Sequence, residues 1–232
     1  STEATILAIT DPSADIAHGY GGTTASLVIT RGSKIDAIGL PEMPIIMGAV
    51  DATGSGANLA ITSDPADLTG RGQWSGLIIS GRGFTNIGND IGEAQAISVP
   101  QGVTRFYGNG VANDNSATLE YVILAEAGRP YTGTSRMHAL TLEAVGSGTR
   151  LNYVQVLGSG GDGIRWFGGG ANAAHVVVNG QSGDGLSFSQ GYNGLVQQAL
   201  VRMGETMGDK GIAGANGDPS ETGRPNFINV TL

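Results

Sequence analysis

Short apolar runs, separated by segments rich in Gly, Asn and Asp, recur along the whole chain. Several alternate between apolar and polar residues, so that Leu27 and Ile29 share one face of a strand, as do Val154 and Val156. A possible helical period over residues 194–208 is weak, and we expect a strand and a loop there. The pattern predicts an all-β chain, with strands over residues 26–30, 44–47, 76–80, 95–99, 118–124, 139–145, 151–157, 174–178, 195–203 and 227–232.

The C-terminal half contains an internal repeat. The segment Gly161 to Phe167, with the sequence GDGIRWF, recurs as GDGLSFS from Gly183, and a looser copy begins at Gly208. A strand-like run precedes each copy, so the unit is a strand, a Gly-rich turn, a short strand and a second turn. A period of about 22 to 26 residues is typical of one coil of a β-solenoid. We therefore predict a single solenoid domain over residues 1–232, with 1–25 as an N-terminal cap or assembly segment and 51–73 as a projecting loop.

The composition excludes several classes of protein and of binding partner. The 40 glycines among 232 residues argue against a helical protein, because an interior Gly costs a helix about 1 kcal/mol. The net charge of −8, without a basic run, argues against nucleic acid and anionic membranes as partners. No apolar run approaches the roughly 20 residues of a membrane span. The absence of cysteine excludes disulfides, and the start at Ser1 fits a processed mature protein or a trimmed chain.

From Trp74 onward the sequence carries motifs that resemble a family of large secreted bacterial right-handed β-helix proteins, largely uncharacterised in activity, and the match covers roughly residues 26–232. Trp74 to Gly81 is similar to the family's W-G-G-L-I-I-L-G strand. Tyr107 to Val122 is similar to its Y-G-G-N-D-x-D-N-S-G-x-L-R-Y-V segment, and residues 140–156 and 161–169 match its next two patterns, with Gly161 in place of an Asp. The resemblance implies a right-handed parallel β-helix and an extracellular or cell-surface location. It implies no reaction.

Three acidic residues of the repeat are the candidate metal ligands: Asp162, Asp184 and Asp209. In stacked coils they would form a column with a spacing of about 5 Å, in which carboxylates bind Ca²⁺ or work as an acid and base pair. The alternative is that Asp beside Gly serves the turns. Asp114, Glu120 and Glu126 fit turn or surface roles, and His18, His138 and His175 show no metal-binding spacing. Apart from this weak Ca²⁺ candidate, we expect no cofactor.

Surface candidates come from the repeat and from the last strand. Arg165 and Trp166 together fit a basic and aromatic sugar-binding strip, although Trp166 shares its repeat position with Phe188 and so equally fits the core. On the final strand, Asn226, Phe227 and Val230 are candidates for an assembly surface.

No motif for nucleophilic catalysis or phosphate binding is present, so we expect a protein without enzymatic activity. The first functional hypothesis is an extracellular structural protein that assembles head to tail with copies of itself into a fibre or surface layer. The alternatives are a carbohydrate-binding or polysaccharide-cleaving β-helix, with glycans as partners, and an adhesin module.

Overall fold

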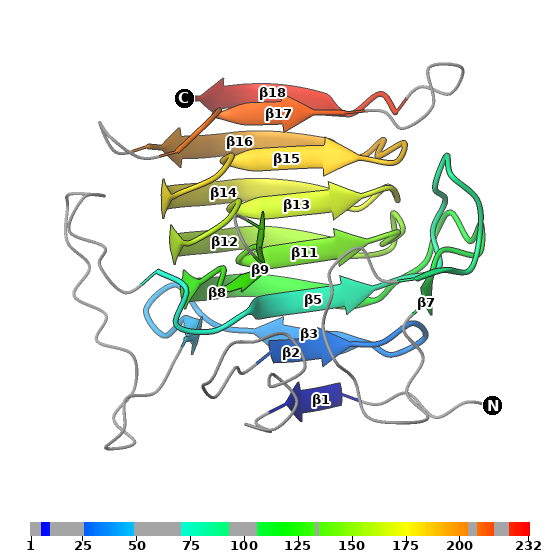
Figure 1. Cartoon of the computed structure of the whole chain (residues 1–232), viewed down its shortest axis with the longest axis horizontal. Coiled ribbons are helices and arrows are strands. Elements are labelled where there is room, and N and C mark those ends of the chain that lie inside the picture. Colours follow the sequence, from blue (N-terminus) through cyan, green and yellow to red (C-terminus); the bar gives the residue numbers. More distant parts are fainter. Residues whose placement is uncertain are drawn as a thin grey trace.

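The computed structural model describes residues 6–9, 26–48, 71–92, 106–132, 135–203, 208–215 and 223–232. These residues form strands and no helix. Most of the strands stack into two tall sheets that lie one behind the other, with the chain climbing from β1 at one end to β18 at the other (Figure 1).

The front sheet, here called sheet A, is built of short strands. In spatial order they are β1 (Ile6–Ile9), β2 (Ser26–Ile29), β5 (Gly76–Ser80), β11 (Leu140–Glu143), β13 (Ile164–Phe167), β15 (Leu186–Ser189) and β17 (Ile212–Gly214). All pairs are parallel except β1 with β2, which is antiparallel. The antiparallel β1 therefore ends the parallel series at this edge of sheet A.

The second sheet, sheet B, is parallel throughout, and five of its seven strands have six or more residues. The seven strands are β3 (Ile35–Ile38), β4 (Ile45–Met47), β8 (Ala117–Ala127), β12 (Arg150–Ser159), β14 (Asn172–Gln181), β16 (Leu195–Arg202) and β18 (Asn226–Thr231). Two small antiparallel pairs lie outside both sheets: β6 (Ile91–Gly92) with β7 (Phe106–Tyr107), and β9 (Pro130–Thr132) with β10 (Ser135–Arg136).

The pairing register confirms the predicted right-handed parallel β-helix. In sheet A, Leu140 aligns with Ile164, then Leu186, then Ile212. One copy of the predicted repeat therefore forms one coil. The coil that separates Leu77 from its neighbour Leu140 is longer, because the chain passes through β6 to β10 before it returns to sheet A.

Strands β8, β12 and β14 each contain a left-handed residue near their C-terminal end, at Glu126, Gly158 and Gly180. Each long strand of sheet B also bends earlier, at another residue in the left-handed backbone region. The bend residues have φ between 51° and 55° and align from coil to coil; we call this set the corner column: Tyr121, Tyr153, His175, Gln198 and Asn229. Left-handed φ is unfavourable for residues with a Cβ, so the bend must be stabilised by stacking of the coils. The bend divides each strand into a first limb and a second limb.

Aliphatic ladders fill the space between the sheets. Leu77, Leu140, Ile164 and Leu186 form one ladder from sheet A, and all four are fully buried. The second Gly of each repeat is required by this packing, because a Cβ on Gly185 would lie 2.3 Å from Cγ1 of Val201. Burial of one aliphatic side chain contributes about 1.5–3 kcal/mol, so each ladder joins adjacent coils strongly.

The predicted strands that lie in the described residues are confirmed within a few residues, and β1, β3, β6, β7, β9 and β10 were not predicted. Strand 95–99, most of segment 1–25 and residues 51–70 lie outside the described residues. The projecting loop over residues 51–73 stays a prediction, because most of it lies outside the described residues. Residues 71–73 lie against the solenoid wall, where Gly72 N donates to Ala127 O and Gln73 N to Glu126 O, both at 2.8 Å.

Candidate functional site

The repeated aspartates bind the backbone of the next coil. Oδ1 of Asp162 accepts a hydrogen bond from the Asp184 amide at 2.9 Å, and Oδ1 of Asp184 accepts one from the Lys210 amide at 3.1 Å. Each carboxylate thus satisfies an amide at the turn that precedes the next strand of sheet A. This geometry is the turn role that was one of the two interpretations of the repeat.

The predicted column of three carboxylates is wrong in its third member. Because Leu186 pairs with Ile212, the residue in register with Asp162 and Asp184 is Lys210 and not Asp209. The Lys210 ammonium lies 4.0 Å from the Asp184 carboxylate and also pairs with Asp209. Within the described residues, no three His, Cys, Asp or Glu side chains are grouped so that they could hold a metal ion. The Ca²⁺ prediction therefore has no ligand set at this column.

Asp162 is the centre of a buried polar cluster that joins successive coils. Its Oδ2 accepts from the Ser187 hydroxyl at 2.6 Å and from Nη1 of Arg165 at 3.0 Å. The Asp162 amide donates to Nδ1 of His138 at 3.1 Å, which requires an unprotonated Nδ1. We call Asp162, His138, Arg165 and Ser187 the Asp162 cluster.

Burial sets the protonation of this cluster. It lowers the pKa of His138 to about 4, and Asp162 opposes that shift while Arg165 adds to it. Burial raises the pKa of Asp162, but the charge of His138, the hydrogen bonds from Ser187 and Asp184 and the Arg165 charge outweigh it and leave the pKa lowered. Because His138 is neutral at pH 7, Ser187, Asp184 and Arg165 hold Asp162 ionised there.

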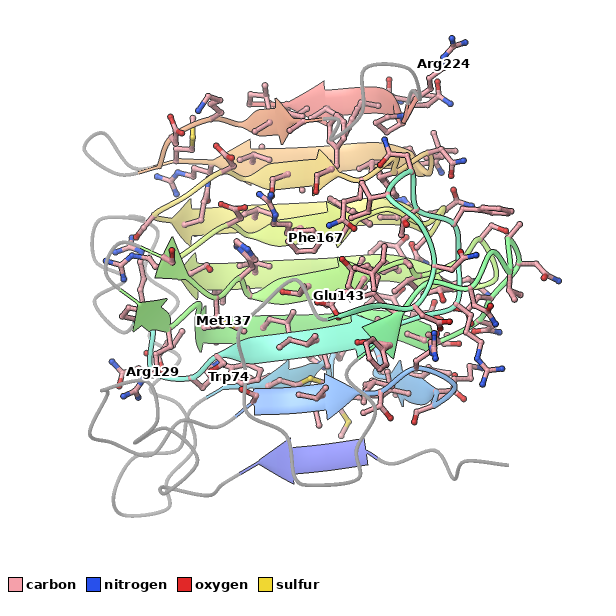
Figure 2. All side chains as sticks on the ribbon, turned by 45° about the vertical axis from the view of Figure 1, so that its right-hand side comes forward. Trp74, Arg129, Met137, Glu143, Phe167 and Arg224 are labelled. Atoms are coloured by element: carbon pink, nitrogen blue, oxygen red, sulfur yellow. The ribbon has the colours of Figure 1, made fainter. Side chains whose placement is uncertain are left out.

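The Asp162 cluster is closed to a large ligand. Asp162 is 7% exposed and His138 9% exposed. On the outer face of sheet A, Ile78, Thr141 and Glu143 are fully buried (Figure 2 marks Glu143, with Phe167 on the next strand). This face is therefore covered where Ile78, Thr141 and Glu143 lie, and the Asp162 cluster serves to join coils.

The residues predicted to lie on a binding or assembly surface have different environments in the structure. Trp166 is fully buried and stacks on Tyr192 with ring centroids 5.0 Å apart, so its assignment to a surface strip with Arg165 is wrong and its core role is right. Arg165 instead lies over the Phe167 ring, 4.8 Å from its centroid. Of the three predicted assembly residues on β18, Phe227 and Val230 are partly buried against the core and Asn226 is exposed.

An aromatic stack follows the corner column on the outside of sheet B. The rings of Tyr121 and Tyr153 stack at 4.5 Å, and those of Tyr153 and His175 at 4.3 Å, each pair within 5° of parallel. Such pairs contribute about 0.5–1.5 kcal/mol each beyond the buried area, so the stack stabilises the corner. Tyr153 is nevertheless 39% exposed, which leaves ring edges open to solvent.

His175 lies between two hollows on either side of this stack. The first hollow, of about 320 Å³, lies over the first limb and is polar; it is lined by Arg150, Leu151, Asn152, Asn172, Ala173, Ala174, His175, Leu195 and Gln197. The second, of about 210 Å³, lies over the second limb and is mostly apolar; it is lined by Pro41, Pro44, Tyr121, Ile123, Tyr153, Val154, Gln155, His175 and Val177. We call them the amide hollow and the tyrosine hollow.

The hydrogen bond between His175 Nδ1 and Asn152 Oδ1, at 2.8 Å, fixes the histidine tautomer. Asn152 Oδ1 only accepts, so Nδ1 carries the proton and Nε2 of the neutral ring is an acceptor. No described residue that lines either hollow is acidic, although the chain carries a net charge of −8. Arg150 is exposed and has no ion-pair partner among the described residues. Among the described residues, the lining of the two hollows thus offers amides, ring edges, the imidazole acceptor of His175 and the guanidinium of Arg150.

The sequence alone predicts no joint site from these residues. Its histidines, His175 among them, lack a metal-binding spacing. The sequence contains one sign of the site, because Tyr121, Tyr153 and His175 occupy the same position in successive predicted strands. The sequence does not show that the strands bend at this position, and only the bend places the three rings together on an outer corner.

A comparison with protein families gives one match. Residues 2–232, which is nearly the whole chain, match the model described as a pectate-lyase-like beta helix domain. Curated proteins and solved structures gave no match. In the part of the chain that the structure describes, no helix is long and apolar enough to cross a membrane.

Proposed function

Because the chain belongs to the family of pectate-lyase-like β-helix domains, we propose that it binds a polysaccharide on the corner of sheet B, across the amide and tyrosine hollows. The observation that carries the proposal is the continuity of the two hollows through His175, beside the exposed ring stack. Sugar rings offer hydroxyl groups to amides and apolar C–H faces to aromatic surfaces, and this corner presents both.

An acidic polysaccharide such as pectate is the favoured ligand class. The guanidinium of Arg150 forms bidentate hydrogen bonds with carboxylates, and no acidic side chain among the described lining residues competes for it. His175 Nε2 and the side chains of Asn152 and Gln197 accept and donate hydrogen bonds to hydroxyl groups.

We propose binding without cleavage. Glycoside hydrolysis commonly requires two carboxyl groups about 5 to 10 Å apart, and the described lining of the two hollows contains none. The Asp162 cluster is buried and its carboxylate is occupied by Ser187, Arg165 and Asp184. The absence of enzymatic activity stays a prediction, and an assay for new reducing ends or unsaturated products with pectate tests it.

The test of binding uses substitutions that preserve the bend. Asn tolerates left-handed φ and already occupies the corner column at position 229, so Tyr153→Asn and His175→Asn remove a ring without straining the backbone. Gln198→Asn is the matched control, because Gln198 has the same backbone conformation and lies outside the lining of both hollows. We expect calorimetric affinity for pectate to fall about tenfold for the two ring variants and to stay unchanged for the control.

Two results would contradict the proposal: equal loss of affinity in all three variants, or no loss in any of them. The preference for acid is tested separately with Arg150→Gln, which we expect to lower affinity for pectate but not for a neutral glycan. Arg202→Gln, on the second limb of β16, is its control.

An extracellular or cell-surface location and head-to-tail assembly stay predictions. Electron microscopy of concentrated protein tests assembly, and fields that contain only monomers would count against it. Secretion from the native host, measured by fractionation, tests location.

A further inference from the structure

A third hollow lies next to the amide hollow, at the turns that lead from sheet A to sheet B. It measures about 280 Å³ and is lined by Phe84, Ala112, Ser147, Gly169, Gly170, Asn172 and Asn193. We call it the Phe84 hollow. Asn172 lines both this hollow and the amide hollow, just as His175 lines both the amide and the tyrosine hollows. Because both shared residues belong to β14, the three hollows form one series along this strand.

Backbone hydrogen bonds fix Phe84 at this position. Gly169 N donates to Phe84 O at 2.7 Å, and Asn86 N donates to Gln190 O at 3.1 Å, so the segment after β5 is attached to two turns of later coils. The Phe84 side chain nevertheless remains 57% exposed. An exposed aromatic side chain on an anchored backbone, above a hollow with amide and hydroxyl groups, provides a fixed surface for a sugar ring.

We infer that the Phe84 hollow is an additional binding site for the same polysaccharide, so that one oligosaccharide runs from Phe84 past Asn172 and Arg150 to His175 and the tyrosine hollow. This inference rests on the proposed function. The path crosses the first limb of sheet B and follows the residues that adjacent hollows share.

The sizes of the hollows support a ligand of several rings. Sites for small molecules are commonly about 300–1,000 Å³, and none of the three hollows reaches far into that range alone. A short oligosaccharide gains only the contacts of one or two hollows. A longer one reaches the third without a second loss of translational freedom, so its affinity rises with length.

The experiment measures the affinity of oligogalacturonates, from the dimer to the octamer, for the whole chain and two variants. Phe84→Ala removes the ring from the Phe84 hollow. Phe106→Ala is the matched control, because Phe106 is also exposed, lies on the neighbouring β7 and does not line the hollow. Both side chains are substantially exposed, so both variants are expected to fold.

We expect the wild-type affinity to rise with length and then reach a plateau. Phe84→Ala should leave the shortest bound oligomer unaffected and weaken the longest by roughly fivefold, whereas Phe106→Ala should change neither. Length-independent affinity, or equal weakening of all lengths by Phe84→Ala, would overturn the inference while leaving the proposed function in place. Failure of every oligomer to bind the wild-type chain would overturn both.

Discussion

Protonation of His138 should make the solenoid sensitive to acid. The buried ring accepts the Asp162 amide through Nδ1, and burial lowers the pKa of His138 from 6.5 to about 4. In the unfolded chain the ring takes up a proton near pH 6.5, whereas in the folded chain it does so only near pH 4. The unfolded state therefore binds more protons throughout that window, and the free energy of unfolding falls as the pH falls.

The size of the effect follows from the shift. One pKa unit corresponds to about 1.36 kcal/mol, so the His138 contribution lost between pH 6.5 and about 4 amounts to at most about 3 kcal/mol. The stability that Asp162 contributes, with its lowered pKa, is present above pH 3.8 and is lost only below that window. The raised pKa of Asp184 acts in the opposite direction, and equally in the wild type and in a His138 variant.

The perturbation is His138→Gln, whose amide oxygen can accept the Asp162 amide and does not titrate. Urea denaturation at a series of pH values between 7 and 4 measures the free energy of unfolding of the wild type and of the variant. We expect the variant to lose about 1 kcal/mol at pH 7 and to show a much shallower decline with acid, so that the two curves converge or cross near pH 4. Parallel curves for the two proteins would refute the assignment of a buried neutral His138.

Three further predictions concern the interior and are checked by urea unfolding at pH 7. Gln181 is fully buried and neither amide atom has a partner among the described residues, so Gln181→Met should raise the free energy of unfolding by about 1–2 kcal/mol; a loss would point to a bound water. Trp166→Ala should cost about 3–5 kcal/mol because it empties the stack on Tyr192, and a cost below about 1 kcal/mol would contradict that core role. Gly185→Ala should destabilise by several kcal/mol because its Cβ would lie 2.3 Å from Val201, whereas Gly92→Ala, with open space around its Cβ, should be nearly neutral; equal effects would refute the packing argument.

The sequence predicted the layered fold because each coil repeats its own pattern. Alternation at Val154 and Val156, and the recurrence of GDG at Gly161 and Gly183, report local requirements that are the same in every coil. The repeat also indicated the turn role of Asp162. It did not predict that Lys210 would take the third position, because the last copy is out of step with the pairing register.

The candidate site was not predictable in the same way. Phe84, Asn172 and His175 come from separate parts of the coils, and only the stacking of coils and the bend at the corner column bring their hollows together. For Trp166 the repeat alone was informative. Tryptophan is a residue type typical of sugar binding, but Trp166 shares its repeat position with Phe188, which indicated a core position, and the structure buries it there.

The most direct test of the proposed function is a crystal structure of the chain soaked with hexagalacturonate. We predict sugar density on the outer corner of sheet B, with a carboxylate at the Arg150 guanidinium and a hydroxyl group at His175 Nε2. Density on the outer face of sheet A, beside the Asp162 cluster, would contradict this account, as would empty hollows at ligand concentrations that saturate binding in solution.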